Sequence, residues 1–255
     1  MLSKLIKKMG MGLALSSLIF SVSLTTHAGP IGVYEFSVFM NATELGATSV
    51  GETQIANGFT GVSEFSGAGL SFSFANNLDA DNLGTMSMSI TNTSGSNLSN
   101  AWMYGFLDAE VDEPINSFFN ETGSVANFTA GSGSADAQAD SWEVDEPGFL
   151  FGNIYDNLLV GALDNSVGTA NPDDVSLGLG FNVGDLLIGE TLSAIFEISL
   201  TDNGGLFQYD PNSQFGFYYN GSVSRVAASV PEPATLMLFS LGLIGLVGLR
   251  RRRGI

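Results

Sequence analysis

Apolar and polar residues alternate in short runs through the centre of the chain, and this period of two constrains the fold more than any other feature. In an extended strand successive side chains point to opposite faces, so alternation gives a strand one buried and one solvent-facing side. Turn-forming residues, such as Ser94-Gly95 and Asn203-Gly204-Gly205, separate the runs. The clearest runs are residues 34–38, 70–74, 86–90, 177–181 and 195–200.

No segment shows a sustained helical period with caps, and the spacing of the runs does not fit strand–helix–strand units. The sequence therefore predicts an all-β fold, a single antiparallel β-sandwich of the immunoglobulin-like or jelly-roll-like kind. Residues 215–226 are predicted to form a hairpin whose tight turn is Asn220-Gly221. The chain has no cysteine, so the sandwich must be held by its core, to which 19 Phe and two Trp can contribute.

The N-terminus has the three parts of a secretory signal. Lys4, Lys7 and Lys8 form a positive region, residues 9–24 form an apolar stretch, and Thr26-His27-Ala28 supplies small residues at a cleavage site. We predict that residues 1–28 are a signal peptide with a helical apolar part, and that signal peptidase cuts between Ala28 and Gly29.

The C-terminal segment, residues 230–255, also has three parts. Val230-Pro231-Glu232-Pro233 is stiff and extended, Ala234 to Leu249 carries no charge, and the cluster Arg250, Arg251, Arg252 and Arg253 follows. As a helix the apolar run would span about 24 Å, and snorkelling arginines can bridge the gap to a hydrocarbon core of roughly 30 Å. We predict a hydrophobic transmembrane helix whose arginines stop transfer and stay cytoplasmic, with the main domain outside.

This order of parts resembles the PEP-CTERM sorting signal, and Pro231, Glu232 and Pro233 match the signature tripeptide of that family. The resemblance implies processing by exosortase, a membrane enzyme that acts on proteins bound for the outer surface, often in species that make exopolysaccharide. It therefore implies an exported protein that is anchored by its C-terminal helix until processing and is then at the cell surface or extracellular. It says nothing about residues 29–229, the acidic middle domain.

Charge is distributed very unevenly. All but one of the 26 acidic residues lie within residues 29–229, against a single base, Arg225. A field of that sign repels phosphates, so nucleic acid and anionic membrane surfaces are excluded as partners of the middle domain. Two interpretations of the acids stay open, an acidic and soluble exterior or the binding of a cation such as Ca²⁺.

Signal cleavage would remove His27, the only histidine, and would leave a middle domain without His, Cys or Lys. That excludes Ser-His-Asp and Cys-His catalysis, histidine zinc sites and Schiff-base chemistry. Only carboxylate chemistry, chiefly that of a glycosidase, survives. Because the sequence marks no catalytic pair among so many acids, we predict that the protein is not an enzyme.

Two features of the middle domain are candidates for ligand binding. Asp108, Glu110 and Asp112 would share one face of an extended segment, where a cation would relieve their repulsion, as exposure to water also would. Tyr218 and Tyr219 are adjacent in a predicted strand, so one of them must point outward, where it could contact a carbohydrate.

Residues 89–95 and 184–191 resemble strand and turn segments of the immunoglobulin-like repeats of bacterial surface proteins. The two ends and the lack of catalytic side chains favour a non-enzymatic structural or adhesive role in the surface or biofilm matrix. The alternatives are a carbohydrate-binding module, with or without calcium, and a carboxylate-dependent glycosidase. Exopolysaccharide or another matrix component is the expected partner.

Overall fold

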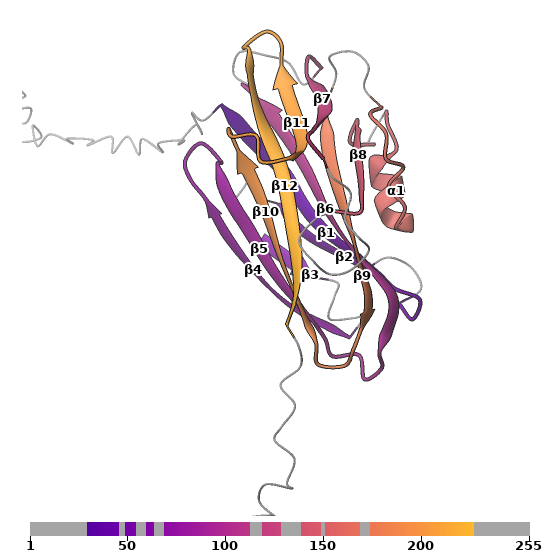
Figure 1. The fold of residues 1–255 in the computed structure, drawn as a ribbon. Helices are drawn as coiled ribbons and strands as arrows, with labels where there is room; N and C mark the ends of the chain where they lie inside the picture. The colour runs from indigo at the N-terminus through magenta and orange to yellow at the C-terminus, as the bar shows by residue number, and fades with distance from the viewer. Residues whose placement is uncertain are drawn as a thin grey trace, which may run out of the picture.

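A computed structural model describes residues 30–45, 49–54, 60–63, 69–112, 119–128, 139–148, 151–168 and 174–226. These residues form two six-stranded sheets in which every neighbouring pair of strands is antiparallel (Figure 1). The prediction of an all-β antiparallel sandwich is therefore confirmed. The predicted flanking helices lie outside the described residues.

The first sheet has the order β3-β2-β1-β6-β9-β8. Its strands are β1 (Ile31–Asn41), β2 (Ser49–Gln54), β3 (Thr60–Ser63), β6 (Leu98–Val111), β8 (Ser141–Asp145) and β9 (Ser176–Leu186). The second sheet has the order β4-β5-β10-β12-β11-β7. Its strands are β4 (Leu70–Leu78), β5 (Gly84–Asn92), β7 (Thr122–Ala126), β10 (Thr191–Ser199), β11 (Gly205–Asp210) and β12 (Phe215–Val226).

In the second sheet the alternating runs bury one side of the strand, as the sequence predicted. Met86, Met88 and Ile90 of β5 are buried, while the residues between them are half-exposed. Aromatic rings from both sheets meet in the core, where Phe196 of β10 contacts Phe36 of the first sheet edge to face, with ring centroids 5.2 Å apart. Such pairs add about 0.5–1.5 kcal/mol each to the burial of their apolar surface.

Residues 215–226 do not form the predicted hairpin. They are one continuous strand, β12, in which Asn220 pairs with Glu197 and Gly221 pairs with Phe196 of β10. Gly221 serves packing instead of a turn, because a Cβ at this position would lie 2.9 Å from the ring of Phe196 and 3.0 Å from that of Phe181. Tertiary packing has therefore overridden the local turn preference of the Asn-Gly pair.

A short helix that the sequence did not predict covers part of the first sheet's outer face. This helix, α1 (Ile154–Val160), buries Ile154 and Leu158 against Phe39, Tyr104 and Phe106 in a second apolar cluster. It ends at Gly161, whose φ of 71° is the left-handed conformation that favours glycine at a helix end. The first sheet is thus buried over part of both faces, whereas the outward side chains of β5, β10 and β12 in the second sheet are half-exposed or exposed.

Candidate binding sites

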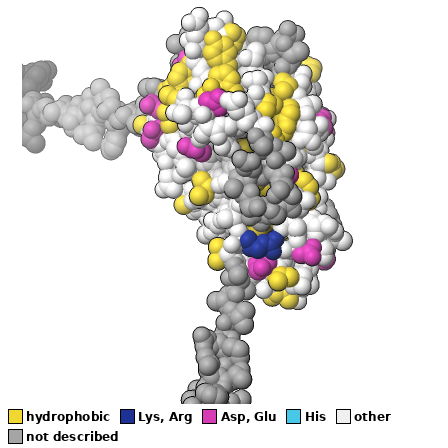
Figure 2. Space-filling model, viewed as in Figure 1, with side chains coloured by type: hydrophobic (Ala, Val, Ile, Leu, Met, Phe, Trp, Pro, Cys, Tyr) yellow, Lys and Arg dark blue, Asp and Glu magenta, His cyan; other side chains and the backbone are white. Residues whose placement is uncertain are grey.

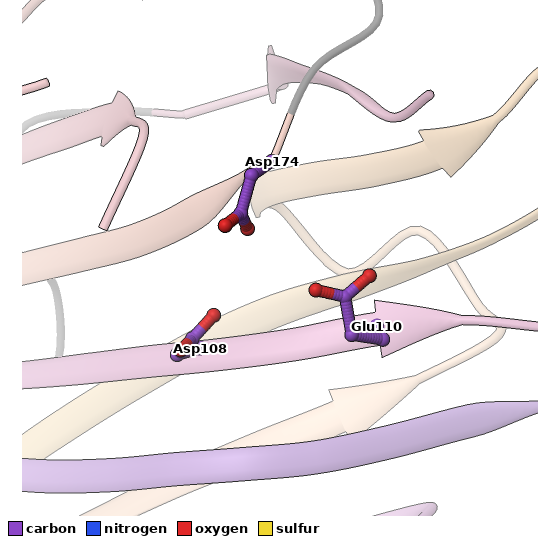
Figure 3. Close-up of side chains that lie close together, drawn as sticks. All are labelled: Asp108, Glu110 and Asp174. Atoms are coloured by element: carbon purple, nitrogen blue, oxygen red, sulfur yellow. The ribbon is translucent and has the colours of Figure 1, made fainter. Parts of the chain in front are cut away.

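Three carboxylates converge on the outer face of the first sheet (Figure 3). Asp108 and Glu110 are two residues apart in β6, so they project on the same side, and Asp174 reaches toward them from just before β9. One oxygen of each carboxylate lies within 4.8 Å of the others. Asp112 is not part of this group, because β6 ends at Val111 and Asp112 has a φ of 53°.

The surroundings of this cluster disfavour negative charge. Burial raises the pKa of Asp108 to about 7, and the nearby charges of Asp174 and Glu35 act in the same direction. The hydroxyl of Ser176, 3.2 Å from Asp108 Oδ1, donates a hydrogen bond that lowers this pKa by a smaller amount. A proton is therefore held on the cluster near neutral pH.

A second acidic group lies at the edge between the two sheets. Glu121 has no exposed surface, and the backbone N–H of Val111 donates to its Oε1 over 2.6 Å. The Nε2 of Gln208 donates to the other oxygen of Glu121 and to the carbonyl of Ala109. Burial raises the pKa of Glu121 to about 8, with further contributions from Asp174 and Asp210, so Asp174 couples this group to the first cluster.

In the part of the chain that the structure describes, no basic side chain balances these acids. Within the described ranges the single base is Arg225, whose Nη1 lies 2.8 Å from Glu190 Oε2 in a different part of the molecule. Oxygen ligands of this kind suit Ca²⁺ or Mg²⁺. Protons relieve the same repulsion, so the cluster by itself does not establish a metal site.

Tyr218 and Tyr219 lie on opposite faces of β12. Tyr219 is fully buried and stacks on Phe196, with ring centroids 5.9 Å apart and an interplanar angle of 12°. Tyr218 is half-exposed on the outer face of the second sheet. The ring that the sequence expected to point outward is therefore that of Tyr218, which stays the candidate ligand contact, whereas the ring of Tyr219 belongs to the core.

Tyr218 is part of a strip of rings that the sequence analysis did not identify. In the ladder between β11 and β12, Phe207 pairs with Tyr218, and their ring centroids are 4.6 Å apart. Tyr209 lies two residues further along β11 and stacks on Phe207 at 6.0 Å. We call Phe207, Tyr209 and Tyr218 the aromatic strip. Its members are half-exposed, and Figure 2 shows apolar side chains gathered over β11 and β12.

The rest of this outer face carries mainly small polar groups. The outward positions of β5, β10 and β12 are mostly hydroxyls and amides, with one exposed isoleucine, Ile195, and one acid, Glu197. These polar residues are Thr85, Ser87, Ser89, Thr91, Thr191, Ser193, Ser199, Asn220, Ser222 and Ser224. Figure 2 views the molecule from the side of these strands, and most of the described side chains visible beside them are neither charged nor apolar.

A hollow of about 240 Å³ opens where the aromatic strip ends. Its walls include Glu197 of β10, Asn220 of β12 and Asn203 of the loop between β10 and β11. The Nδ2 of Asn203 donates to Glu197 Oε2 over 2.7 Å, and the Nδ2 of Asn220 donates to the carbonyl of Asn203 over 3.1 Å. Because Asn220 is two residues from Tyr218 on the same face, rings and hollow form one continuous surface.

The predicted targeting residues lie outside the described part of the chain. They are the cleavage pair Ala28 and Gly29, the motif Pro231, Glu232 and Pro233, and the cluster Arg250, Arg251, Arg252 and Arg253. Among the helices that the structure describes, none has the length and apolar character needed to cross a bilayer.

Comparison with known families assigns the C-terminal segment. Residues 229–253 match the family model of the PEP-CTERM protein-sorting motif, so the resemblance noted from the sequence is confirmed. The motif implies that the chain is exported, sorted to the cell surface and processed by exosortase. No curated protein and no solved structure gave a match, and the immunoglobulin-like resemblance of the middle domain receives no support.

Proposed function

We propose that this PEP-CTERM protein is a non-enzymatic, adhesive component of the surface matrix, which holds neutral polysaccharide on the outer face of its second sheet. The observation that carries the proposal is the aromatic strip of Phe207, Tyr209 and Tyr218, half-exposed on a sheet face rich in hydroxyls and amides. The sorting motif supports it, because the domain is delivered to the place where such polymers lie.

The chemistry of a sugar chain suits both parts of this face. The C–H faces of pyranose rings are apolar and can stack on Phe207 and Tyr218, while the sugar hydroxyls exchange hydrogen bonds with side chains such as Asn220 and Ser222. The strong negative charge of the domain repels acidic polymers. A neutral polysaccharide is therefore the favoured ligand class.

Titration of the exported, processed protein with the organism's own exopolysaccharide tests the proposal. Phe207→Ala and Tyr218→Ala should each weaken binding roughly two- to tenfold, since a ring contact contributes about 0.5–1.5 kcal/mol. Phe151→Ala is the matched control, because Phe151 is an aromatic residue that is 64% exposed and does not belong to the strip. Binding that is absent, or that all three substitutions weaken equally, would contradict the assignment of this face.

The non-enzymatic part of the proposal has its own test at Glu197, the acid in the hollow. Purified protein should release no reducing sugar from the polysaccharide, and Glu197→Gln should change nothing in that assay. Turnover that disappears in Glu197→Gln would replace the adhesive role with a carboxylate glycosidase.

A calcium-assisted form of the same function is favoured by the convergence of Asp108, Glu110 and Asp174. If Ca²⁺ binds there, it should raise the melting temperature, because it stabilises the folded domain that carries the polysaccharide-binding face. A melting temperature that does not change in millimolar Ca²⁺ would remove calcium from the account. Loss of matrix cohesion on deletion of the gene is the expected phenotype, and an unchanged biofilm would count against a structural role.

A further inference from the structure

Two adjacent apolar residues are exposed at the tip between β9 and β10. Leu187 is 46% exposed and Ile188 is 51% exposed, although both directly follow the buried Leu186 at the end of β9. Val226, the last residue of β12, is 55% exposed and pairs with Thr191 at the start of β10. These three apolar side chains therefore lie at the same end of the sandwich, and we call them the apolar tip.

The conformation of the tip is held by a network of hydrogen bonds. Arg225, the single base of residues 29–229, pairs with Glu190 and donates to the carbonyls of Val183 and Asp185. In Figure 2 basic, acidic and apolar side chains lie together at this lower end of the molecule.

Backbone groups of the tip are also held by side chains from within the connection between β9 and β10 and from outside it. The N–H of Leu187 donates to Glu190 Oε2 over 2.8 Å, and the N–H of Ile188 donates to Asn97 Oδ1 over 3.2 Å. Because these hydrogen bonds hold the connection between β9 and β10 on both sides, the exposure of Leu187 and Ile188 is built into the fold.

The tip lies where the chain leaves the sandwich toward its sorting segment. Pro231 follows Val226 by five residues, which span at most about 17 Å when fully extended. The uncharged run begins at Ala234, within about 27 Å of Val226 by the same reckoning. A bilayer crossed by that run is therefore within reach of the tip.

We propose that Leu187, Ile188 and Val226 rest on the lipid surface while the C-terminal segment is in the membrane. This contact holds Pro231-Glu232-Pro233 close to the membrane plane, where a membrane-embedded processing enzyme reaches it, and it goes beyond the adhesive function proposed above. The neighbouring carboxylate of Asp185 is exposed, so the surface that fits is zwitterionic lipid instead of anionic lipid. Because the C-terminal segment tethers the domain to the membrane, the local concentration of the apolar tip at the lipid surface is high, which compensates for the small size of the patch.

The absence of cysteine allows a direct test on the full-length chain. Ile188→Cys and Asn212→Cys are each labelled with an environment-sensitive fluorophore in phosphatidylcholine nanodiscs. Asn212 is the matched control, because it is exposed in the turn before β12, at the opposite end of a strand of about 36 Å. The label at residue 188 should be at least threefold less accessible to aqueous iodide than the label at residue 212. Leu187→Ser in the Ile188→Cys background should restore part of that access.

Equal iodide access at the two labels would overturn the proposal. Shielding of residue 188 that appears only when exosortase is added would overturn it as well, because the tip would then dock on the enzyme and not on lipid. Unchanged melting temperatures of the labelled proteins would show that the fold is intact, as expected for substitutions at exposed positions.

Discussion

The buried carboxylates predict an unusual pH dependence of stability, which Asp108→Asn tests. Burial and the neighbouring carboxylates raise the pKa of Asp108 from its ordinary value of 3.8 to about 7, so the folded protein keeps a proton that the unfolded chain releases. The contribution of protonated Asp108 to the free energy of unfolding is therefore fully present below pH 3.8, and it is lost as the pH rises through about 7. Most proteins with paired carboxylates behave in the opposite way.

The magnitude follows from the shift of about three pKa units, each of which corresponds to about 1.4 kcal/mol. At pH 8 the ionisation of Asp108 should cost about 4 kcal/mol as an upper limit, and at pH 3 it should cost almost nothing. Water at the partly exposed cluster reduces the cost, so we expect about 2–4 kcal/mol. An asparagine resembles the protonated carboxyl in shape, and its Oδ1 can still accept the hydrogen bond from Ser176.

Urea unfolding at pH 4, 6 and 8 is the assay. Asp108→Asn should be more stable than the wild type by about 2–4 kcal/mol at pH 8, and the difference should shrink toward zero at pH 4. Asp112→Asn is the matched control, because Asp112 lies on the same segment outside the cluster and should give a curve parallel to the wild type. A gain from Asp108→Asn that is equal at all three pH values would refute the reasoning.

The same samples distinguish protons from a cation. If Ca²⁺ occupies the cluster, it should raise the stability of the wild type at pH 8 by more than that of Asp108→Asn. Equal responses of the two proteins would place any bound calcium elsewhere.

Three further substitutions test the packing of the core and the hydrogen bonds that hold the apolar tip. Tyr219→Phe should raise the free energy of unfolding by about 1–3 kcal/mol, because the buried hydroxyl of Tyr219 has no hydrogen-bond partner among the described residues. A loss of stability in urea unfolding would argue against an unpaired hydroxyl. Gly105→Ala should lower it by about 1–3 kcal/mol, since the added methyl would lie 2.2 Å from the ring of Phe196; an unchanged melting temperature would show that the core can yield there. Arg225→Gln should lower the free energy of unfolding by about 1–3 kcal/mol, because Glu190 loses its ion pair and the carbonyls of Val183 and Asp185 lose a donor. Calorimetry that shows no change would mean that this network contributes nothing to stability.

The sequence predicted the sandwich because strands such as β5 and β10 have one buried face and one more exposed face, and alternation records that directly. Residues 86–90 and 195–200 were recognised for this reason. The helix α1 is seven residues long, too short to show a helical period, and it is held by packing against Phe39 and Phe106. The Asn220-Gly221 pair led to the wrong prediction of a hairpin, because the rings that face Gly221 leave no room for a side chain and explain the glycine without a turn.

The candidate sites were predictable only where the alternation of side chains along a single strand decides which residues are exposed. Phe217, Tyr219 and Val223 alternate with polar residues, so the pattern could have placed Tyr219 in the core and Tyr218 outside. The meeting of Tyr218 with Phe207 depends on the register of β11 against β12, and the approach of Asp174 to β6 depends on the order of strands in the first sheet. Contacts of this kind are set by topology, which no local pattern encodes.

Hydroxyl-radical footprinting tests the assigned face most directly, because it reports the exposure of each aromatic side chain with and without the polysaccharide. The account predicts that oxidation of Phe207, Tyr209 and Tyr218 falls when the polymer is added, while oxidation of Phe119 and Phe151, which are 57% and 64% exposed, stays the same. Unchanged oxidation of the aromatic strip in a sample that binds the polymer would contradict the account and place the binding surface elsewhere.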